Sequence, residues 1–247
     1  MVKTFDSRYA MQLILEKATL IKRYKRFLAD IVVDDGNVCT SHVANTGAMT
    51  NCGTAGDTIW LSRSTNSKRK YPLSWELTET ANQQYICVNT HRANQLVEQA
   101  LLHGDIAPLS QFSNLKREVS YGEERSKIDF LLTGTNHQQI YVEVKSVTLL
   151  DDKQGYFPDA ITVRGQKHLR ELTTLAKQGQ RTIILFAVLH TDIQSVMPAA
   201  HIDPNYALLA KQAQQAGVEF YAYGLTVQAS QQQFNLALNR RLTVSLT

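Results

Sequence analysis

An aspartate inside an apolar run constrains this chain more than any other feature of its sequence. Asp129 interrupts residues 128–132, which otherwise have the composition of a β-strand. A carboxylate is disfavoured there by strand propensity and by the free energy of burying a charge. A Gly-Thr-Asn-His turn signal follows, and residues 140–147 then alternate so that Glu143 and Lys145 share one face. The two runs predict a hairpin in which Asp129 approaches Glu143.

Such a pair of carboxylates has a direct chemical use. Held close together with their oxygens outward, they make a site for a hard divalent cation such as Mg²⁺ or Mn²⁺. Lys145 would lie about 7 Å beyond Glu143 on the same strand face, where an ammonium can orient a water or stabilise charge on a phosphate. The pattern also fits a solvated Glu–Lys face with Asp129 paired to a structural cation, because short motifs match often by chance.

The wider sequence resembles a known family. Asp129 with Glu143-Val144-Lys145 resembles the PD-(D/E)xK nuclease signature, and its surroundings closely resemble the sugar fermentation stimulation protein A family. The likeness runs over most of the 247 residues. It is carried by residues 23–30, 45–47, 68–71, 88–90, 126–132, 141–148, 157–160 and 164–172.

The resemblance implies a bacterial protein that binds DNA without sequence specificity and regulates maltose or sugar metabolism. Its fold would be an N-terminal OB-like β-barrel at residues 1–88 and a C-terminal PD-(D/E)xK nuclease-like mixed sheet flanked by helices at 89–247. A magnesium-dependent phosphodiesterase centre is the leading interpretation. The alternatives are a non-enzymatic DNA-binding regulator on a nuclease scaffold, and an OB module for single-stranded nucleic acid.

The first 88 residues have the pattern of a small barrel. Short β-like runs are separated by turn signals, of which Asp34-Asp35-Gly36-Asn37 is the strongest. Their number fits a five-stranded OB-type barrel, and such barrels commonly bind nucleic acid on one face. We expect strands near 18–21, 27–33, 37–43, 58–61, 75–78 and 84–88.

Two basic clusters in this region are candidates for DNA binding, since cations next to aromatic residues supply phosphate neutralisation and stacking surfaces. Ordinary solvated strand ends give the same pattern. The 45–47 loop is left out of the site, because Ala48 follows it where the family resemblance implies a longer basic or polar residue. The candidate DNA-binding residues are Lys22, Arg23, Lys25, Arg26, Lys68, Arg69 and Lys70.

Two predicted helices add candidates to the centre. In nucleases of this kind an acidic residue on the first helix often joins the metal site, which points to Glu98 in the helix expected at 92–103. A Gln at the start of a later helix can bind a phosphate or the attacking water, which points to Gln166 in the helix expected at 164–177. Each also fits an ordinary helix-surface residue. His168 could act as a general base, but metal-assisted activation of water is favoured.

The rest of the second half reads as an α/β layer. Residues 181–189 form a nearly continuous apolar run, typical of a central strand covered on both faces. A helix at 206–216, introduced by Asp203-Pro204-Asn205, leads into a strand at 218–223. We expect the acidic stretch 151–158 to be a connection near the site.

Composition excludes several classes. Charged residues at 19% and hydrophobic residues at 43% are typical of a globular protein, and the three cysteines lack any Cys-x-x-Cys spacing. The net charge of +4 does not by itself indicate a nucleic-acid partner. No run is long enough to span a membrane, and residues 1–6 lack the apolar segment of a signal peptide. We expect a cytoplasmic protein, compatible with nucleoid association and with a homo-oligomer.

Overall fold

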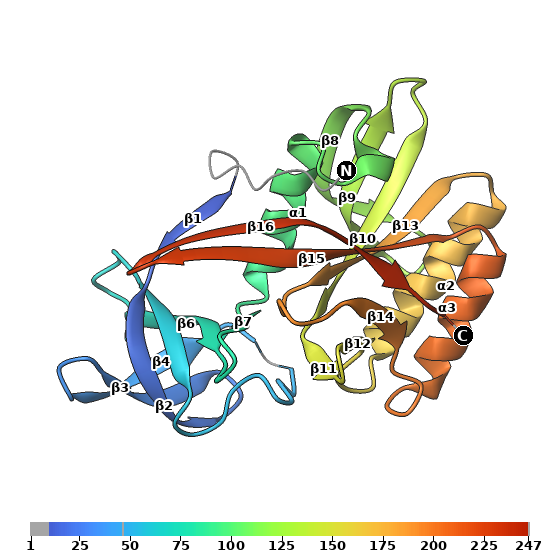
Figure 1. The fold of residues 1–247 in the computed structure, drawn as a ribbon. Coiled ribbons are helices and arrows are strands. Elements are labelled where there is room, and N and C mark those ends of the chain that lie inside the picture. Colours follow the sequence, from blue (N-terminus) through green and yellow to red (C-terminus); the bar gives the residue numbers. More distant parts are fainter. Residues whose placement is uncertain (1–9, 46, 247) are drawn as a thin grey trace.

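The computed structural model describes residues 10–45 and 47–246. Residues 1–6, on which the signal-peptide expectation rests, lie outside the described residues, as does Thr46 of the 45–47 motif. A small barrel and a larger mixed sheet with helices lie side by side (Figure 1). The fold class predicted from the sequence is confirmed.

The barrel closes on itself through one parallel contact. Its strands follow the order β4-β3-β2-β5-β6, β4 then pairs with β6, and β7 adds to the outer edge of β6. Alternate residues such as Ile59 and Leu61 point inward, where they pack around the fully buried Trp75. The strands are β2 (Glu16–Tyr24), β3 (Leu28–Val33), β4 (Val38–Val43), β5 (Thr58–Arg63), β6 (Leu73–Glu79) and β7 (Tyr85–Cys87).

The larger sheet mixes parallel and antiparallel strands. β10, β13 and β15 run parallel at its centre, and antiparallel neighbours flank them. The order is β11-β12-β14-β16-β15-β13-β10-β9-β8. The strands are β8 (Phe112–Tyr121), β9 (Ser126–Gly134), β10 (Gln139–Val147), β11 (Leu149–Asp151), β12 (Gln154–Phe157), β13 (Arg181–Val188), β14 (Ser195–Pro198), β15 (Glu219–Ser230) and β16 (Gln233–Val244).

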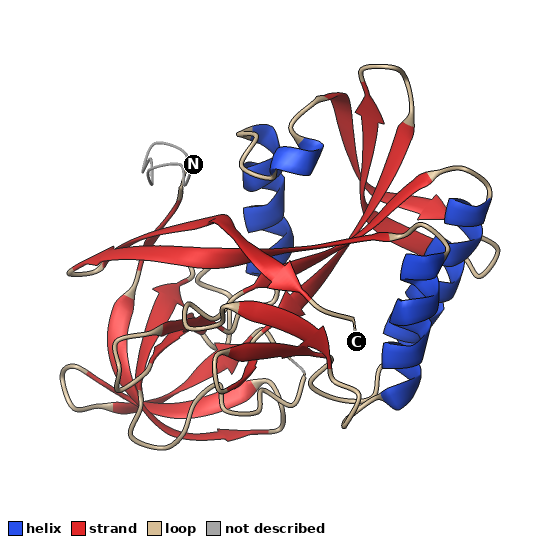
Figure 2. Ribbon diagram, turned by 45° about the vertical axis from the view of Figure 1, so that its right-hand side comes forward, coloured by secondary structure: helices blue, strands red, loops and turns tan. Residues whose placement is uncertain are grey.

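Helices cover both faces of this sheet, as Figure 2 shows. α1 (His91–Leu102) packs on one face, whereas α2 (Val163–Lys177) and α3 (Pro204–Gln215) lie together on the other; a 3₁₀ turn, η2, spans Ala107–Leu109. Within β13, Leu185 belongs to the core under α1 and Phe186 to the core under α2 and α3. This division explains why β13 reads as a continuous apolar run.

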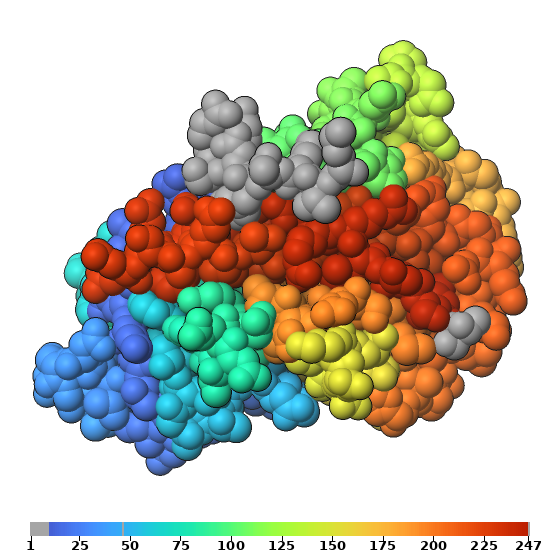
Figure 3. Space-filling model, viewed as in Figure 1, coloured from blue at the N-terminus to red at the C-terminus, as the bar shows by residue number. Residues whose placement is uncertain are grey.

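The sequence did not predict how the barrel and the sheet are joined. β1 (Met11–Ile14) directly precedes the barrel strands in the sequence, but it pairs antiparallel with β16 of the larger sheet. The long β15–β16 hairpin reaches across the barrel (Figure 3), and buried Phe234 of β16 contacts Trp60 and Tyr85 at ring-centroid distances of 4.6 and 5.9 Å. The stretch 151–158, expected to be a connection, contains β12 and the end of β11 because both pair into the sheet edge.

No helix among the described residues is both long enough and apolar enough to cross a membrane.

The contact made by Phe234 leads to a stability prediction. Phe234→Ala should lower the free energy of unfolding by about 3–5 kcal/mol, because it leaves a cavity where barrel and hairpin meet. Phe27→Ala is the matched control, since Phe27 is 47% exposed, and should change stability by less than about 0.5 kcal/mol. Denaturant titration followed by tryptophan fluorescence measures both variants. Equal losses would show that Phe234 does not join the two parts.

Candidate functional site

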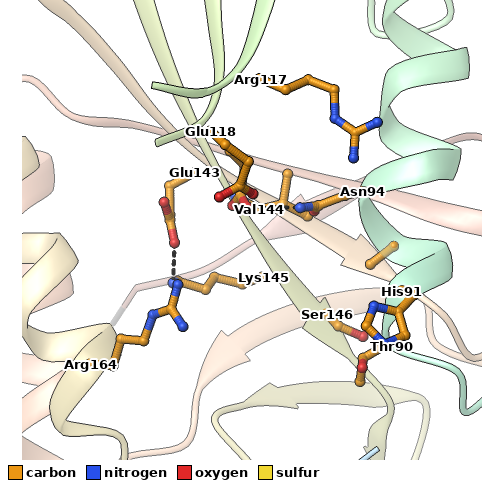
Figure 4. Close-up of a pocket in the computed structure, with 12 residues that line it drawn as sticks. Thr90, His91, Asn94, Arg117, Glu118, Glu143, Val144, Lys145, Ser146 and Arg164 are labelled. Carbon is orange, nitrogen blue, oxygen red and sulfur yellow. Dashed lines mark hydrogen bonds and ion pairs between the residues drawn. The ribbon is translucent and has the colours of Figure 1, made fainter. Parts of the chain in front are cut away.

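One pocket gathers charged side chains from five elements. It has a volume of about 340 Å³ and lies where the start of α1 and the start of α2 meet strands β8, β9 and β10. Its lining is Thr90, His91, Ala93, Asn94, Arg117, Glu118, Asp129, Glu143, Val144, Lys145, Ser146 and Arg164 (Figure 4). Asp129, Glu143 and Lys145, which the sequence motif predicts to be together, all lie in this lining.

The sheet register brings the two predicted carboxylates to the same end of the β9–β10 ladder. The ladder runs as far as Phe130 opposite Val142, and Asp129 and Glu143 are the next residues along the two strands. Instead of a main-chain pair there, the amide of Val144 donates to Asp129 Oδ2 at 2.8 Å. The side chain of Asp129 therefore lies at the end of the ladder, where the strands separate and the pocket opens.

A third carboxylate, which sequence reasoning missed, extends this row. Arg117 and Val119 pair with β9 in register, which places Glu118 opposite Asp129. Glu118 has a φ of +52°, in the left-handed region that a non-glycine residue in a strand rarely adopts. Its side chain lines the pocket, across from Asn94 of α1 (Figure 4). Residues in such strained conformations cluster at functional sites, but the sequence alone gives no sign of the kink.

Asp129 is fixed from two sides. Besides the Val144 amide, the side-chain amide of Asn94 donates to Asp129 Oδ1 at 2.8 Å. These two donors compensate for the burial of a carboxylate in an apolar strand. The alternative drawn from the sequence, a lysine or arginine paired with Asp129, does not describe the contacts found here.

Glu143 is more deeply buried and differently held. Its Oε1 accepts from Lys145 Nζ at 2.6 Å and contacts His168 Nδ1. His168 Nδ1 also lies 3.2 Å from Lys145 Nζ, so the three side chains form a closed group. The second oxygen, Oε2, is buried and has no hydrogen-bond partner among the described residues. Such an orphaned acceptor is unfavourable unless a cation or water satisfies it.

Burial and charge move the pKa values of the two carboxyls in opposite directions. Burial raises the pKa of Asp129, and the charge of Glu143 raises it further, against the hydrogen bonds from Val144 and Asn94. Burial also favours neutral Glu143, but Lys145 and then His168 lower the pKa of Glu143 below its ordinary value. Lys145 and His168 therefore stabilise the charged form of Glu143, whereas burial and the charge of Glu143 oppose the ionisation of Asp129.

Two predicted members of the centre lie elsewhere. The carboxylate of Glu98 pairs with Arg117 at 3.2 Å and is not part of the pocket lining. The contact from α1 to the centre comes instead from Asn94, one turn earlier on the same helix face. Gln166 donates both to Oδ1 and to Oδ2 of Asp203, at 2.9 and 3.0 Å, and is likewise outside the lining. From α2, His168 contacts Glu143, and Arg164 lines the pocket.

The predicted DNA-binding residues differ in their exposure and in their contacts. Lys25 and Arg26 are exposed in the β2–β3 turn, and Lys68, Arg69 and Lys70 are exposed between β5 and β6. Lys22 lies 3.7 Å from the carboxylate of Asp30. Arg23 is different, because its guanidinium donates to the main-chain carbonyls of Arg26, Asn45, Gly47 and Ala48.

Burial lowers the pKa of Arg23, and its donors hold the carbonyls of Asn45, Gly47 and Ala48. The sequence, which shows only a run of basic residues, could not separate it from its neighbours.

The fold and the pocket together define a class: an OB-like barrel joined to a nuclease-like mixed sheet with a buried Asp/Glu/Lys centre. Family models agree with this assignment in both halves of the chain. The SfsA N-terminal OB domain matches residues 21–88, and the sugar fermentation stimulation protein RE domain matches residues 91–231. The chain belongs to the SfsA, or sugar fermentation stimulation protein, family.

One solved structure agrees with the family. SfsA from Pyrococcus furiosus, solved in complex with Ca²⁺, is 26% identical, with a TM-score of 0.83 over 96% of this chain and 100% of that chain. Much weaker matches are a repair endonuclease from Pyrococcus abyssi, at 8% identity and a TM-score of 0.30 over 87% of this chain and 88% of that one, and the EndoMS–dsDNA2 complex, at 11% and 0.31 over 87% of each.

The raised pKa of Asp129 predicts a pH-dependent stability difference. Because the native state holds this proton more tightly than the unfolded chain, the parent loses stability as pH rises from the ordinary carboxyl pKa through the raised value. Asp129→Asn removes this loss. The free energy of unfolding of the variant should therefore gain on that of the parent as pH increases. Denaturant unfolding without metal between pH 3 and pH 8 measures the gain, and a constant difference would contradict it.

Proposed function

We propose that this protein binds DNA without sequence preference and cleaves phosphodiester bonds with a divalent cation held beside Asp129 and Glu143. The observation that carries the proposal is the pocket itself. It combines the carboxylates of Asp129 and Glu143 with the ammonium of Lys145, which are the groups of the PD-(D/E)xK signature, in an opening at the end of a β-ladder. A solvated Glu–Lys face would not bury Glu143 and Lys145 to 3% and 8% exposure.

The donors in the pocket fit a hard cation, Mg²⁺ or Mn²⁺. Glu143 Oε2 is buried without a hydrogen-bond partner, and Asp129 faces the charge of Glu143. No three His, Cys, Asp or Glu side chains within residues 10–45 and 47–246 are grouped to hold a metal. Two carboxylates completed by water are a common arrangement for Mg²⁺. A bound cation would polarise the scissile phosphate and ease ionisation of water. The Ca²⁺ complex of the Pyrococcus furiosus relative supports a divalent ion.

The chain's own residues have separate roles in this proposal. Lys145 Nζ offsets negative charge on the phosphate and orients the attacking water. His168 is a positioning residue, because its Nδ1 contacts both Glu143 and Lys145 while its side chain is not part of the pocket lining. Arg164 extends from the start of α2 beside Lys145 (Figure 4) and adds a second cation for the phosphate. Glu118 supplies a further carboxylate to the wall.

The barrel supplies most of the binding free energy in this proposal. The exposed cations of the β2–β3 turn and the β5–β6 loop can neutralise phosphates without reading bases, which gives non-specific affinity. We propose a boundary between a DNA-binding domain at 1–88 and a nuclease-like domain at 89–247. β1 nevertheless crosses this boundary by pairing with β16.

A regulator without turnover is the second candidate. Lys145 is already engaged by Glu143 and His168, so the centre as it stands is a closed ionic group. If that group does not open to substrate, the pocket binds DNA and does not cleave it. Control of sugar metabolism, the activity in the family's name, would then act through DNA binding alone.

Cleavage is tested with supercoiled, linear and single-stranded DNA in EDTA, Mg²⁺ or Mn²⁺. We expect metal-dependent strand breakage that falls at least about 100-fold in Asp129→Ala and in Lys145→Ala. Asp151→Asn, which removes an exposed carboxylate outside the pocket lining, should cleave like the parent. Binding in EDTA without breakage under any metal would sink the turnover hypothesis and leave the regulator.

Salt dependence tests the DNA contacts. The double variant Lys25→Ala/Arg26→Ala should reduce the slope of log Kd against log salt by about 2 for duplex DNA, one for each lost phosphate contact. Lys177→Ala removes one exposed cation at the far end of α2 and should leave the slope unchanged. Fluorescence anisotropy at 50–300 mM KCl gives all slopes. An unchanged slope in the double variant would remove this turn from the interface.

A further inference from the structure

A second cavity lies between the barrel and the start of α1. It has a volume of about 270 Å³, and strands β4, β5 and β6 form its barrel side. Polar side chains dominate its lining, among them His42, Ser62, Arg69, Ser74 and His91. His91 also lines the acidic pocket. His91 is therefore common to the linings of the two cavities.

The only acid in this lining is already neutralised. Glu76 is 1% exposed, and both of its oxygens accept two hydrogen bonds each. Oε1 accepts from Ser62 and Arg92, and Oε2 accepts from Asn89 and Arg92. Glu76 has no acceptor capacity left for a cation, and its charge is cancelled by Arg92. The cavity is therefore not a metal site.

The donors that remain are positive or neutral. Arg69 is exposed and is not in an ion pair among the described residues. His42 has a buried Nδ1 without a hydrogen-bond partner, so one ring nitrogen has no described contact. Burial lowers the pKa of His42, and Arg69 and then His91 lower it further. His42, Arg69 and His91 line the same cavity, and the N-terminal end of α1 adds its partial positive charge.

The barrel and α1 are locked together beside this space. The hydroxyl of Thr90 donates to the carbonyl of Ala44 at 2.7 Å, which joins the residue before α1 to the chain just after β4. This hydrogen bond ties the start of α1, on one side of the cavity, to the barrel on the other. Fixed donors of this kind suit a tetrahedral oxyanion, which accepts several hydrogen bonds at once.

We propose that this cavity is a second phosphate subsite, which binds a backbone phosphate of the same DNA strand whose scissile phosphodiester lies in the acidic pocket. The inference rests on the proposed DNA binding, and it adds how the strand runs: from the barrel, past His91, to Asp129 and Glu143. Arg69 supplies the charge, and His42 and Ser74 supply shorter-range donors. OB-type barrels bind single strands through such charged grooves, so we assign a single strand to this path.

The test uses the full chain in EDTA, where cleavage is absent, and a single-stranded oligonucleotide of the shortest length that retains full affinity, which limits sliding. A series of oligonucleotides carries one uncharged methylphosphonate linkage at successive positions. Neutralising one particular linkage should weaken binding to the parent about tenfold. The same change should weaken binding to Arg69→Gln and to His42→Gln less than about twofold, since the partner of that phosphate is already lost.

Lys70→Gln is the matched control. Lys70 is the exposed neighbour of Arg69 and lies outside the cavity lining, so it should weaken binding to every oligonucleotide alike and keep the tenfold penalty at that linkage. Equal penalties in the parent and in Arg69→Gln at all linkages would overturn the proposal. Thermal unfolding of each variant confirms that it is folded.

A second arm separates a strand phosphate from a free one. The His42 imidazole proton resonance, assigned with His42→Gln, is followed by NMR during titration with the oligonucleotide or with inorganic phosphate alone. The oligonucleotide should raise the pKa of His42 toward its ordinary value. A response to inorganic phosphate alone, with none to the oligonucleotide, would overturn the strand assignment. A parent that binds no DNA refutes the proposed function itself, whereas binding without cleavage leaves the subsite standing.

Discussion

The burial of one carboxylate determines much of the architecture around it. Asp129 can lie within an apolar strand only because the Val144 amide and the Asn94 side chain donate to it. The first donor requires β10 to separate from β9 just beyond Val142, and the second requires α1 to lie against this edge of the sheet. The opening that results is the pocket. The hydrogen bonds that stabilise the buried carboxylate of Asp129 therefore also create the space beside Glu143 and Lys145.

A shared apolar core links this pocket to the barrel. Leu15, Leu77 and Cys87 come from the barrel side of the chain, yet they pack in one cluster with Leu96 of α1 and Val142 of β10. The core beneath the acidic centre and the core beneath the hairpin are thus continuous. The barrel and the nuclease-like part therefore share buried apolar contacts, unlike domains that are joined only by small polar interfaces.

Residue patterns in the sequence predicted what depends on local periodicity. The hairpin that brings Asp129 to Glu143, the helix with its Asp203 N-cap and the apolar strand at 181–189 follow from spacing and capping rules. Contacts between segments far apart in the sequence could not be predicted from these patterns. β1 joins β16 through residue pairs that lie 219 to 225 positions apart in the sequence, and Glu118 reaches the pocket through a backbone kink that no residue type announces.

The assignments of Glu98 and Gln166 have a similar explanation. Family analogy pointed to Glu98 and Gln166 on these two helices, whereas the side chains that contact Asp129 and Glu143 are Asn94 and His168. Which side chain reaches these carboxylates depends on how each helix is rotated against the sheet. Arg23 shows the same limit for charge: a basic run predicts a charged surface, whereas its carbonyl partners are set by the fold of a loop 22 to 25 residues away.

The connection between barrel and sheet is short. β7 ends at Cys87 and α1 begins at His91, and the intervening Asn89 and Thr90 are held by Glu76 and by the Ala44 carbonyl. The connection is therefore too short and too well hydrogen-bonded to act as a flexible tether between the barrel and the acidic centre. A ligand that contacts both the barrel and the acidic centre must therefore match the spacing set by this connection, unlike a ligand of two domains on a flexible linker.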